Sequence, residues 1–362
     1  MADQNVSKLG IASTTLKAML SASARLWVSP FKGQNGAPTY FKDVMFSMMR
    51  TQLGGLNLAQ DRHLNPANTT PTYLKFAKDN GFAPESITLP SGKLAHWIGS
   101  KSAKQVIVYY HGGGYVMPCG PGHMQYLLSL KDTLVAQGTD AAILLLAYDL
   151  APEFKYPTQL RQAVEVLRYL VETEGRNPSD LTLGGDSAGG NLTLSVLSHL
   201  THPHPDIPPL NLPSKLHGAI LISPWASFNT HTSSFTTNAE KDMFDGRTLG
   251  RWSSAFLGSD SPYAGDFYSE PVLAPASWWE GTADVIEEVL IWGGGNEVLL
   301  DGIVEFARRF ETGFGGKGGR VTTVITDKAA HVEMIVERIL GYKGDSGTGS
   351  VGVINDWVKA KL

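Results

Sequence analysis

The sequence contains a single cysteine, Cys119, among its 362 residues. One cysteine cannot form a disulfide within the chain, and it cannot supply the thiolates of an iron–sulfur cluster or a cysteine-based zinc site. Several histidines lie between His199 and His217, but the prolines of the stretch 202–213 predict a surface loop there rather than a metal site. We therefore expect neither a metal nor an organic cofactor.

Charged residues are also few and nearly balanced. They make up 18% of the chain, the formal net charge is −4, and no basic block stands out. The electrostatic footprint of a protein that binds nucleic acid or an anionic membrane is thus missing at the level of the whole chain. We expect a small-molecule ligand and no nucleic-acid partner.

Long apolar runs are absent as well. The longest strongly apolar run covers residues 141–147, far short of the ~20 residues that a membrane-spanning helix needs. The first residues do not show a basic region followed by a continuous apolar one, so they do not predict a secretory signal. We expect a cytoplasmic protein without stable membrane insertion.

Short runs rich in Val, Ile, Leu and Tyr alternate with stretches that have the apolar spacing of helices. The runs carry few charges, as strands buried on both faces of a sheet do. This alternation predicts an α/β fold with a mostly parallel central sheet flanked by helices. The predicted strands are residues 106–110, 142–148, 181–183, 219–223, 289–292 and 321–325, and the apolar helical positions between them include Leu160, Val164, Leu192, Val196, Ile303 and Phe306.

Two segments break this alternation, residues 1–85 and residues 226–281. The first is rich in Met, Asn, Gly and Pro, and the second in aromatic residues, Ser and Thr, without a clear strand. We expect both to form a helical cap at one edge of the sheet. The core domain then consists of residues 86–225 and 282–362.

The strongest chemical signal is GDSAGG at residues 185–190, which contains the pattern G-x-S-x-G. It lies directly between a predicted strand and a predicted helix. At such a turn the serine oxygen projects clear of the sheet, and the small neighbours let strand and helix approach closely. The pattern predicts Ser187 as a nucleophile, with the amide of Ala188 at the start of the helix.

A second signal, HGGGY, follows the predicted strand 106–110 and occupies residues 111–115. Three consecutive glycines are entropically unfavourable unless the backbone must approach another group closely. A developing oxyanion is such a group. We expect the amides of Gly113, Gly114 and Ala188 to form an oxyanion hole.

The motifs of this chain resemble those of the hormone-sensitive-lipase branch of the α/β-hydrolase family. HGGGY, YDLAPEFKYP at 148–157, GDSAGG and SPW at 223–225 follow in the order and approximate spacing of that family, over residues 87–360. The third motif usually reads Y-R-L-A-P-E, so Asp149 is a departure. The resemblance implies the α/β-hydrolase fold and a carboxylesterase with a Ser-acid-His triad. Family members can also pair through a sheet edge or their last helices, so a homodimer stays open.

The base and the acid of such a triad follow the serine in the chain. His331 lies beyond the last predicted strand, where the family carries its base. The family's D-P-L after the preceding strand aligns with Glu297-Val298-Leu299, which implies Glu297 as the acid in place of the usual aspartate. Asp301 is the alternative acid, and Asp327 is a more distant one.

Aromatic and methionine residues near these motifs have two interpretations. Tyr115, Trp225 and Phe228 would line an apolar substrate pocket or belong to the core. Met45, Met48 and Met49 would form a pliable lid or fill a helix interface. The sequence leaves both choices open.

The function predicted from these residues is hydrolysis of short to medium acyl esters through an acyl-enzyme, with Ser187 attacking and His331 as base. One alternative is a dedicated hydrolase or acyl transferase of a biosynthetic pathway, acting on a lactone, an amide or an acetyl ester of a secondary metabolite. A second alternative is a binding protein that keeps the fold without the chemistry.

Overall fold

The computed structural model describes residues 6–65, 69–258, 265–342 and 349–361. Within them, eight strands form one sheet in the order β1-β2-β4-β3-β5-β6-β7-β8. The pairs β1/β2 and β2/β4 are antiparallel, and all other neighbours are parallel. The strands are β1 (Glu85–Thr88), β2 (Leu94–Ile98), β3 (Gln105–Tyr110), β4 (Ala141–Leu146), β5 (Leu181–Asp186), β6 (Leu216–Ile222), β7 (Ile286–Gly294) and β8 (Arg320–Thr326).

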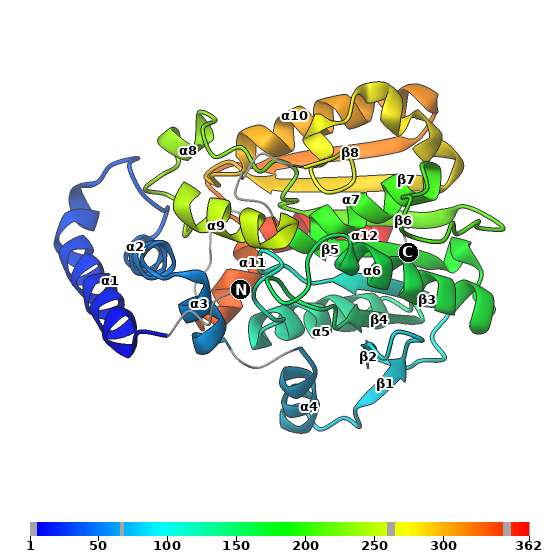
Figure 1. Ribbon diagram of the computed structural model, residues 1–362, viewed down its shortest axis with the longest axis horizontal. Coiled ribbons are helices and arrows are strands. Elements are labelled where there is room, and N and C mark those ends of the chain that lie inside the picture. The colour runs from blue at the N-terminus through cyan, green and yellow to red at the C-terminus, as the bar shows by residue number, and fades with distance from the viewer. Residues whose placement is uncertain (1–5, 66–68, 259–264, 343–348, 362) are drawn as a thin grey trace.

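Helices precede the sheet, connect its strands and end the chain (Figure 1). The α-helices are α1 (Lys8–Val28), α2 (Tyr40–Gly55), α3 (Leu58–Leu64), α4 (Thr69–Asp79), α5 (Pro121–Ala136), α6 (Thr158–Arg168), α7 (Ala188–Thr201), α8 (Ser234–Thr237), α9 (Gly246–Leu257), α10 (Leu300–Gly313), α11 (Glu333–Ile339) and α12 (Ser350–Lys361). Short helical turns are η1 (Ser29–Phe31), η2 (Tyr169–Thr173), η3 (Pro178–Asp180), η4 (Pro271–Leu273), η5 (Ala276–Asp284) and η6 (Gly315–Lys317). Among the described helices, none is long and apolar enough to cross a membrane.

The sheet separates two hydrophobic layers. Because successive residues of a strand point to opposite faces, Val108 of β3 packs in one layer and Ile107 in the other. Residues of α6, α7 and α10 belong to the first layer, and residues of α5, α11 and α12 to the second. The helices therefore cover both faces of the sheet, as the alternation of runs in the sequence predicts.

All six strands expected from the sequence are present, with ends shifted by a few residues. The α/β fold with a mostly parallel sheet is thus confirmed. Strands β1 and β2 were not predicted from the sequence. In β1 one of four residues is buried, and β2 contains His96, so neither has the apolar character of the central strands.

The segment before the sheet packs against the segment that follows β6. Helices α2 and α3 contact α9, and Figure 1 shows α1 at the outer edge of the molecule with α2 beside it. A buried carboxylate joins the two segments, because Asp61 accepts hydrogen bonds from Trp252 Nε1 at 3.0 Å and from Arg251 at 3.0 Å. Both segments lie at the carboxyl ends of the parallel strands, because they line one cavity together with residues that follow β3, β5 and β8.

Candidate active site

Ser187 sits in the turn between β5 and α7 with φ +52° and ψ −115°. Few residues other than glycine adopt a positive φ, and strain of this kind is typical of functional turns. The flanking glycines are required by the close approach of strand and helix. A Cβ on Gly189 would lie 1.8 Å from the carbonyl oxygen of Tyr110, and one on Gly185 would lie 2.2 Å from the carbonyl oxygen of Gly189.

His331 and Glu297 form a buried pair beside this turn. The imidazole Nδ1 lies 2.7 Å from Glu297 Oε2, so Nδ1–H donates to the carboxylate. The other carboxylate oxygen, Oε1, accepts from the amide of Gly294 at 2.5 Å and from Ser223 Oγ at 3.0 Å. The ends of β6 and β7 and the loop after β8 supply these residues. Glu297 thus holds the imidazole by one oxygen and is itself held by the other.

The environment of His331 favours its protonated form. Burial of the imidazole opposes protonation, but the hydrogen bond and negative charge of Glu297 outweigh burial and raise the pKa of His331 above 6.5. The carboxylates of Asp242 and Asp186 act in the same direction. The pair can therefore accept a proton readily and stabilise the imidazolium that results.

The alternative acid, Asp301, lies elsewhere. It belongs to the first turn of α10, where its Oδ2 accepts from the amide of Ser234 at 2.8 Å. Its carboxylate thereby anchors α8 to α10. The structure brings Glu297, and not Asp301, into contact with His331.

Asp242 is a second carboxylate near the pair, and sequence reasoning missed it. It is fully buried and accepts hydrogen bonds at 2.8 Å from the amides of Met243 and Val298. Burial, together with the charge of Glu297, raises the pKa of Asp242 to about 6, although His331 acts against this. No motif marks Asp242, because only folding brings residues 242–243 against the loop after β7.

The glycine loop after β3 is tied to the turn that carries Ser187. The carboxylate of Asp186 accepts from the amide of Gly112 at 3.0 Å and from Tyr109 Oη at 2.9 Å, and its Oδ2 lies 3.2 Å from His123 Nε2. Burial alone would raise the pKa of Asp186, but His123 and these donors lower it. An ionised Asp186 therefore fixes the position of the glycine loop after β3. The sequence analysis did not assign this role to it.

Beyond that anchor, the loop presents backbone donors. Gly113 and Gly114 have φ +110° and +60°, a backbone conformation that favours glycine. The amides of Gly113, Gly114 and Ala188 have no hydrogen-bond acceptor within the described part of the chain. Ala188 is the first residue of α7, where the amides of a helix have no partner in the preceding turn.

A cavity of about 560 Å³ opens above these groups. Ser187, His331, Gly113 and Gly114 line it, together with a largely apolar wall. Five of the nine methionines of the chain belong to that wall: Met19, Met48, Met49, Met117 and Met243. Met45, the third methionine singled out in the sequence of α2, does not.

A comparison with models of protein families shows to which family the chain belongs. Residues 107–335 match the model described as the alpha/beta hydrolase fold. The chain belongs to this family. The matched range includes the glycine loop, Ser187, Glu297 and His331, so it confirms the family that the sequence motifs indicate.

Curated relatives of this α/β hydrolase are ester and acetyl hydrolases. An acetyl-hydrolase of Streptomyces hygroscopicus is 28% identical over 61% of the chain and 67% of its own length. Steryl acetyl hydrolase 1 of Saccharomyces cerevisiae is 26% identical over 67% of the chain and 53% of its own length. A carboxylesterase of Mycobacterium tuberculosis is 30% identical over 50% of the chain and 51% of its own length. The matches thus span half to two thirds of these relatives.

Solved structures give the same relationship over more of the chain. The esterase EstE5, in a crystal soaked with p-nitrophenyl butyrate, superposes with a TM-score of 0.60 at 26% identity and covers 82% of this chain and 92% of its own. An esterase of the bacterial hormone-sensitive lipase family, 23% identical with a TM-score of 0.61, covers 94% of this chain and 98% of its own and shares its fold. These findings place the α/β hydrolase among carboxylic ester hydrolases.

Three aromatic residues that were candidates for substrate contact lie in the core of this α/β hydrolase. Tyr115, Trp225 and Phe228 are almost fully buried, and none is among the described residues that line the Ser187 cavity. Tyr115 stacks on Phe256 with ring centroids 3.8 Å apart and donates to Asn191 Oδ1 at 2.6 Å. Of the two interpretations that the sequence leaves open, their burial favours the core.

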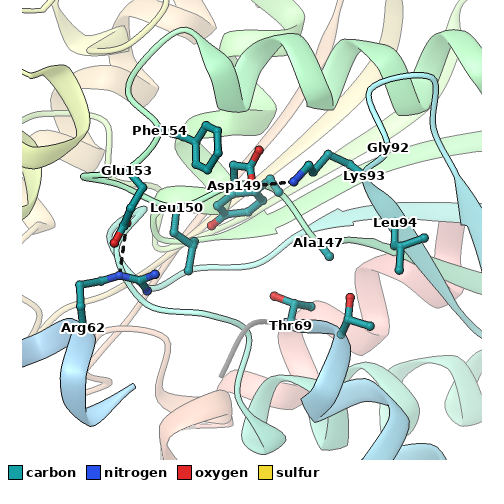
Figure 2. A pocket seen from close by; sticks show the side chains of 12 residues that line it. Arg62, Thr69, Gly92, Lys93, Leu94, Ala147, Asp149, Leu150, Glu153 and Phe154 are labelled. Carbon is teal, nitrogen blue, oxygen red and sulfur yellow. Dashed lines mark hydrogen bonds and ion pairs between the residues drawn. The ribbon is translucent and has the colours of Figure 1, made fainter. Parts of the chain in front are cut away.

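A separate cavity of about 420 Å³, lined in part by charged side chains, lies beside the loop after β4. Figure 2 shows Arg62 pointing toward Glu153, and Lys93 toward Asp149, along its wall. The first pair is 3.4 Å apart and the second 2.8 Å. Asp149, the residue that departs from the usual family motif, thus forms an ion pair with Lys93, the residue before β2.

Proposed function

We propose that the protein is a serine carboxylic-ester hydrolase in which Ser187, His331 and Glu297 form the triad. The observation that carries this proposal is the 2.7 Å contact between His331 Nδ1 and Glu297 Oε2 beside a cavity that both His331 and Ser187 line. The pair leaves Nε2 of the imidazole as the atom that can accept a proton. A held base, a serine on a strained turn and unpaired backbone amides are the components that acyl transfer requires.

In the first half-reaction, His331 Nε2 takes the proton of Ser187 Oγ while Oγ bonds to the carbonyl carbon of the ester. The amides of Gly113, Gly114 and Ala188 donate to the oxygen that becomes negative, and loss of one such donor typically costs about 3 kcal/mol. The bond between carbon and alcohol oxygen then breaks, and His331 gives its proton to the leaving alcohol.

In the second half-reaction, water gives a proton to His331 Nε2 and bonds to the acyl carbon. The bond to Ser187 Oγ then breaks, and His331 returns the proton to the serine, so a carboxylic acid is released. Glu297 stabilises the imidazolium in both halves. Every step uses side chains, backbone amides and water.

The wall of the cavity indicates an ester with an apolar acyl or alcohol part. Methionine side chains adapt to ligands of different shape, and ligand pockets are mostly apolar with few polar groups. A cap of residues 1–85 and 226–281 would supply most of this wall, since α1, α2 and Met243 contribute to it.

A second candidate is a dedicated deacetylase that removes acetyl groups from a large apolar alcohol. It is supported by the names of two relatives, an acetyl-hydrolase and a steryl acetyl hydrolase. The cavity of about 560 Å³ offers room for such an alcohol.

The test compares p-nitrophenyl esters from acetate to palmitate with the wild type and with Ser187→Ala, Glu297→Gln and Asp301→Asn. We expect Ser187→Ala to abolish turnover, Glu297→Gln to lower kcat about 10³–10⁴-fold because the imidazole loses its charged partner, and Asp301→Asn to retain kcat. Each variant is checked for an unchanged melting transition.

Wild-type activity in Ser187→Ala would remove the serine from the mechanism, and a loss confined to Asp301→Asn would assign the acid to that residue. A serine-reactive phosphonate probe tests the non-catalytic alternative. Labelling of Ser187 without turnover of simple esters would favour the dedicated deacetylase, and absence of labelling would favour a binding protein.

A further inference from the structure

Helix α1 carries its large apolar side chains on the side that faces away from the protein. Leu9, Leu16, Leu20 and Trp27 are 85%, 58%, 60% and 81% exposed. Because a helix completes a turn in 3.6 residues, their spacing places all four on one narrow stripe. A surface helix of a globular protein normally turns such a stripe toward the core.

The opposite face of α1 packs on α2 through small side chains. Thr14 and Ala18 are buried, Thr14 Oγ1 donates to the carbonyl of Gly55 at 3.2 Å, and the hydroxyl oxygens of Ser21 and Ser47 are 2.6 Å apart. The orientation of α1 is thus set by specific contacts, and those contacts turn the leucines outward. Figure 1 shows that α1 is the outermost element on its side of the molecule.

The apolar surface continues in two directions. At the end of the helix it includes Phe31, which is 87% exposed. Toward the site it reaches the rim of the catalytic cavity, because Met19, Leu64 and Ile339 are exposed and also line that cavity. Met19, the neighbour of Leu20 on α1, thus connects the stripe with the cavity that Ser187 lines.

The segment that contains α1, residues 6–42, carries charged side chains of one sign only. Residues 6–42 contain five cations and neither Asp nor Glu, although the whole chain is balanced. Arg25 and Lys32 pair with Asp43, and Lys42 is buried. Lys8 and Lys17 are exposed on α1 and make no ion pair with the described residues.

We propose that the outer face of α1 docks the protein on an anionic lipid surface, with the helix lying in the plane of the interface. Apolar side chains flanked by cations, with tryptophan at one end, are the composition that binds there. A second copy of the chain fits this face less well, since a symmetric contact would gather the lysines of both α1 helices without acidic partners on either helix. The delivery of an apolar ester from the lipid to Ser187 rests, in addition, on the proposed function.

The experiment measures sedimentation of the full chain with vesicles of phosphatidylcholine, with and without phosphatidylserine. We expect binding to the anionic vesicles, and Leu16→Ser combined with Leu20→Ser should weaken it about tenfold or more because the buried apolar area is lost. Val135→Ser combined with Val304→Ser is the matched control, since these valines are similarly exposed on α5 and α10. Lys17→Gln should weaken binding about fivefold, and only to anionic vesicles.

Trp27 provides a direct readout, because the other seven tryptophans are buried or partly buried. Its fluorescence should shift to shorter wavelength on addition of vesicles, and Trp27→Phe should remove that shift. Failure of the wild type to bind, or equal binding by the Leu16/Leu20 variant, overturns the proposal. A dimer in analytical ultracentrifugation that this variant dissociates, without vesicle binding, overturns it in favour of a second copy.

The rates of hydrolysis of a soluble and a vesicle-bound ester distinguish a defect in docking from a defect in catalysis. The Leu16/Leu20 variant should hydrolyse a short, water-soluble ester at the wild-type rate, because neither leucine lines the cavity, and should lose activity on an apolar ester dissolved in the vesicles. Loss of both activities in the wild type would contradict the proposed function while leaving the sedimentation result to decide the docking.

Discussion

Asp242 is a second buried carboxylate beside the pair formed by His331 and Glu297. It holds the amide of Val298, the residue after Glu297, and its charge adds to those of Glu297 and Asp186 around the imidazole. With its own pKa raised to about 6, Asp242 is ionised at neutral pH. In the proposed reaction we therefore expect it to act through His331, as a positioning residue.

The expected effect of Asp242→Asn is a shift of the pH profile. An anion beside His331 favours the imidazolium and raises its pKa, so removing the charge lowers that pKa and leaves His331 neutral at lower pH. The acidic limb of kcat/KM should move down by about one pH unit. The measurement is the pH dependence of ester hydrolysis, with Asp301→Asn as control. An acidic limb that stays in place in Asp242→Asn would show that Asp242 has no electrostatic role.

Two carboxylates that lie close together in the sequence differ in role because of their surroundings. Glu297 and Asp301 are four positions apart, but the first lies on the imidazole and the second on Ser234. The resemblance in sequence pointed to Glu297 as the acid and left Asp301 open, since spacing alone places both after β7. The direction of the side chains is decided by the first turn of α10, which carries Asp301 away from His331.

At the scale of elements, the junction of β5 and α7 is the most demanding local structure in the molecule. The helix starts one residue after Ser187, and its second residue lies against the carbonyl of Tyr110 at the end of β3. Only glycine allows that distance. The glycines of the motif are therefore required by the close approach of two backbone segments, and this is why the motif could be recognised without the structure.

Gly189→Ala should destabilise the protein by about 3 kcal/mol or more, since its Cβ would displace backbone atoms and overpacking of this kind is costly. The control is Gly316→Ala, where a Cβ would meet nothing within 4 Å. Chemical denaturation of both variants measures the free energy of unfolding. Equal stability of the two variants would mean that the junction is looser than the structure shows.

At the scale of the whole molecule, buried ion pairs join the N-terminal helix α2 to the core. Lys42 of α2 is buried and forms ion pairs with Glu333 and Glu337 of α11, at 2.6 Å and 2.5 Å. Helix α11 begins two residues after His331. The same salt bridges thus join the wall of the cavity to the segment that carries the base.

Lys42→Met should lower the free energy of unfolding by about 3–5 kcal/mol, because a buried carboxylate is left without its cation. Adding Glu333→Gln should recover part of that loss. Lys78→Met, an exposed lysine of α4, is the control. Urea unfolding of the three variants is the measurement, and a Lys42→Met variant as stable as the control would show that the ion pairs do not hold α2 on the core.

Features that depend on local backbone geometry and periodicity could be predicted from the amino-acid sequence. Strands β3 to β7, the turn at Ser187 and the glycine loop follow from apolar runs and small residues, since burial on both faces and close approach restrict which residues fit. Strand β1 could not be predicted in the same way, because its edge position leaves polar residues acceptable. Strand β2 lies inside the sheet and is largely buried, but His96 interrupts its apolar run.

Which distant side chains meet is known only from the folded chain. Folding placed Glu297 rather than Asp301 on His331, moved Tyr115 into the core, brought Asp242 to the site and turned the leucines of α1 outward. These outcomes depend on how helices pack over the ends of the strands, and packing is set by long-range contacts that no window of sequence contains. The net charge of the whole chain likewise does not reveal that residues 6–42 contain no acidic residue, because their cations are balanced by acidic residues elsewhere in the chain.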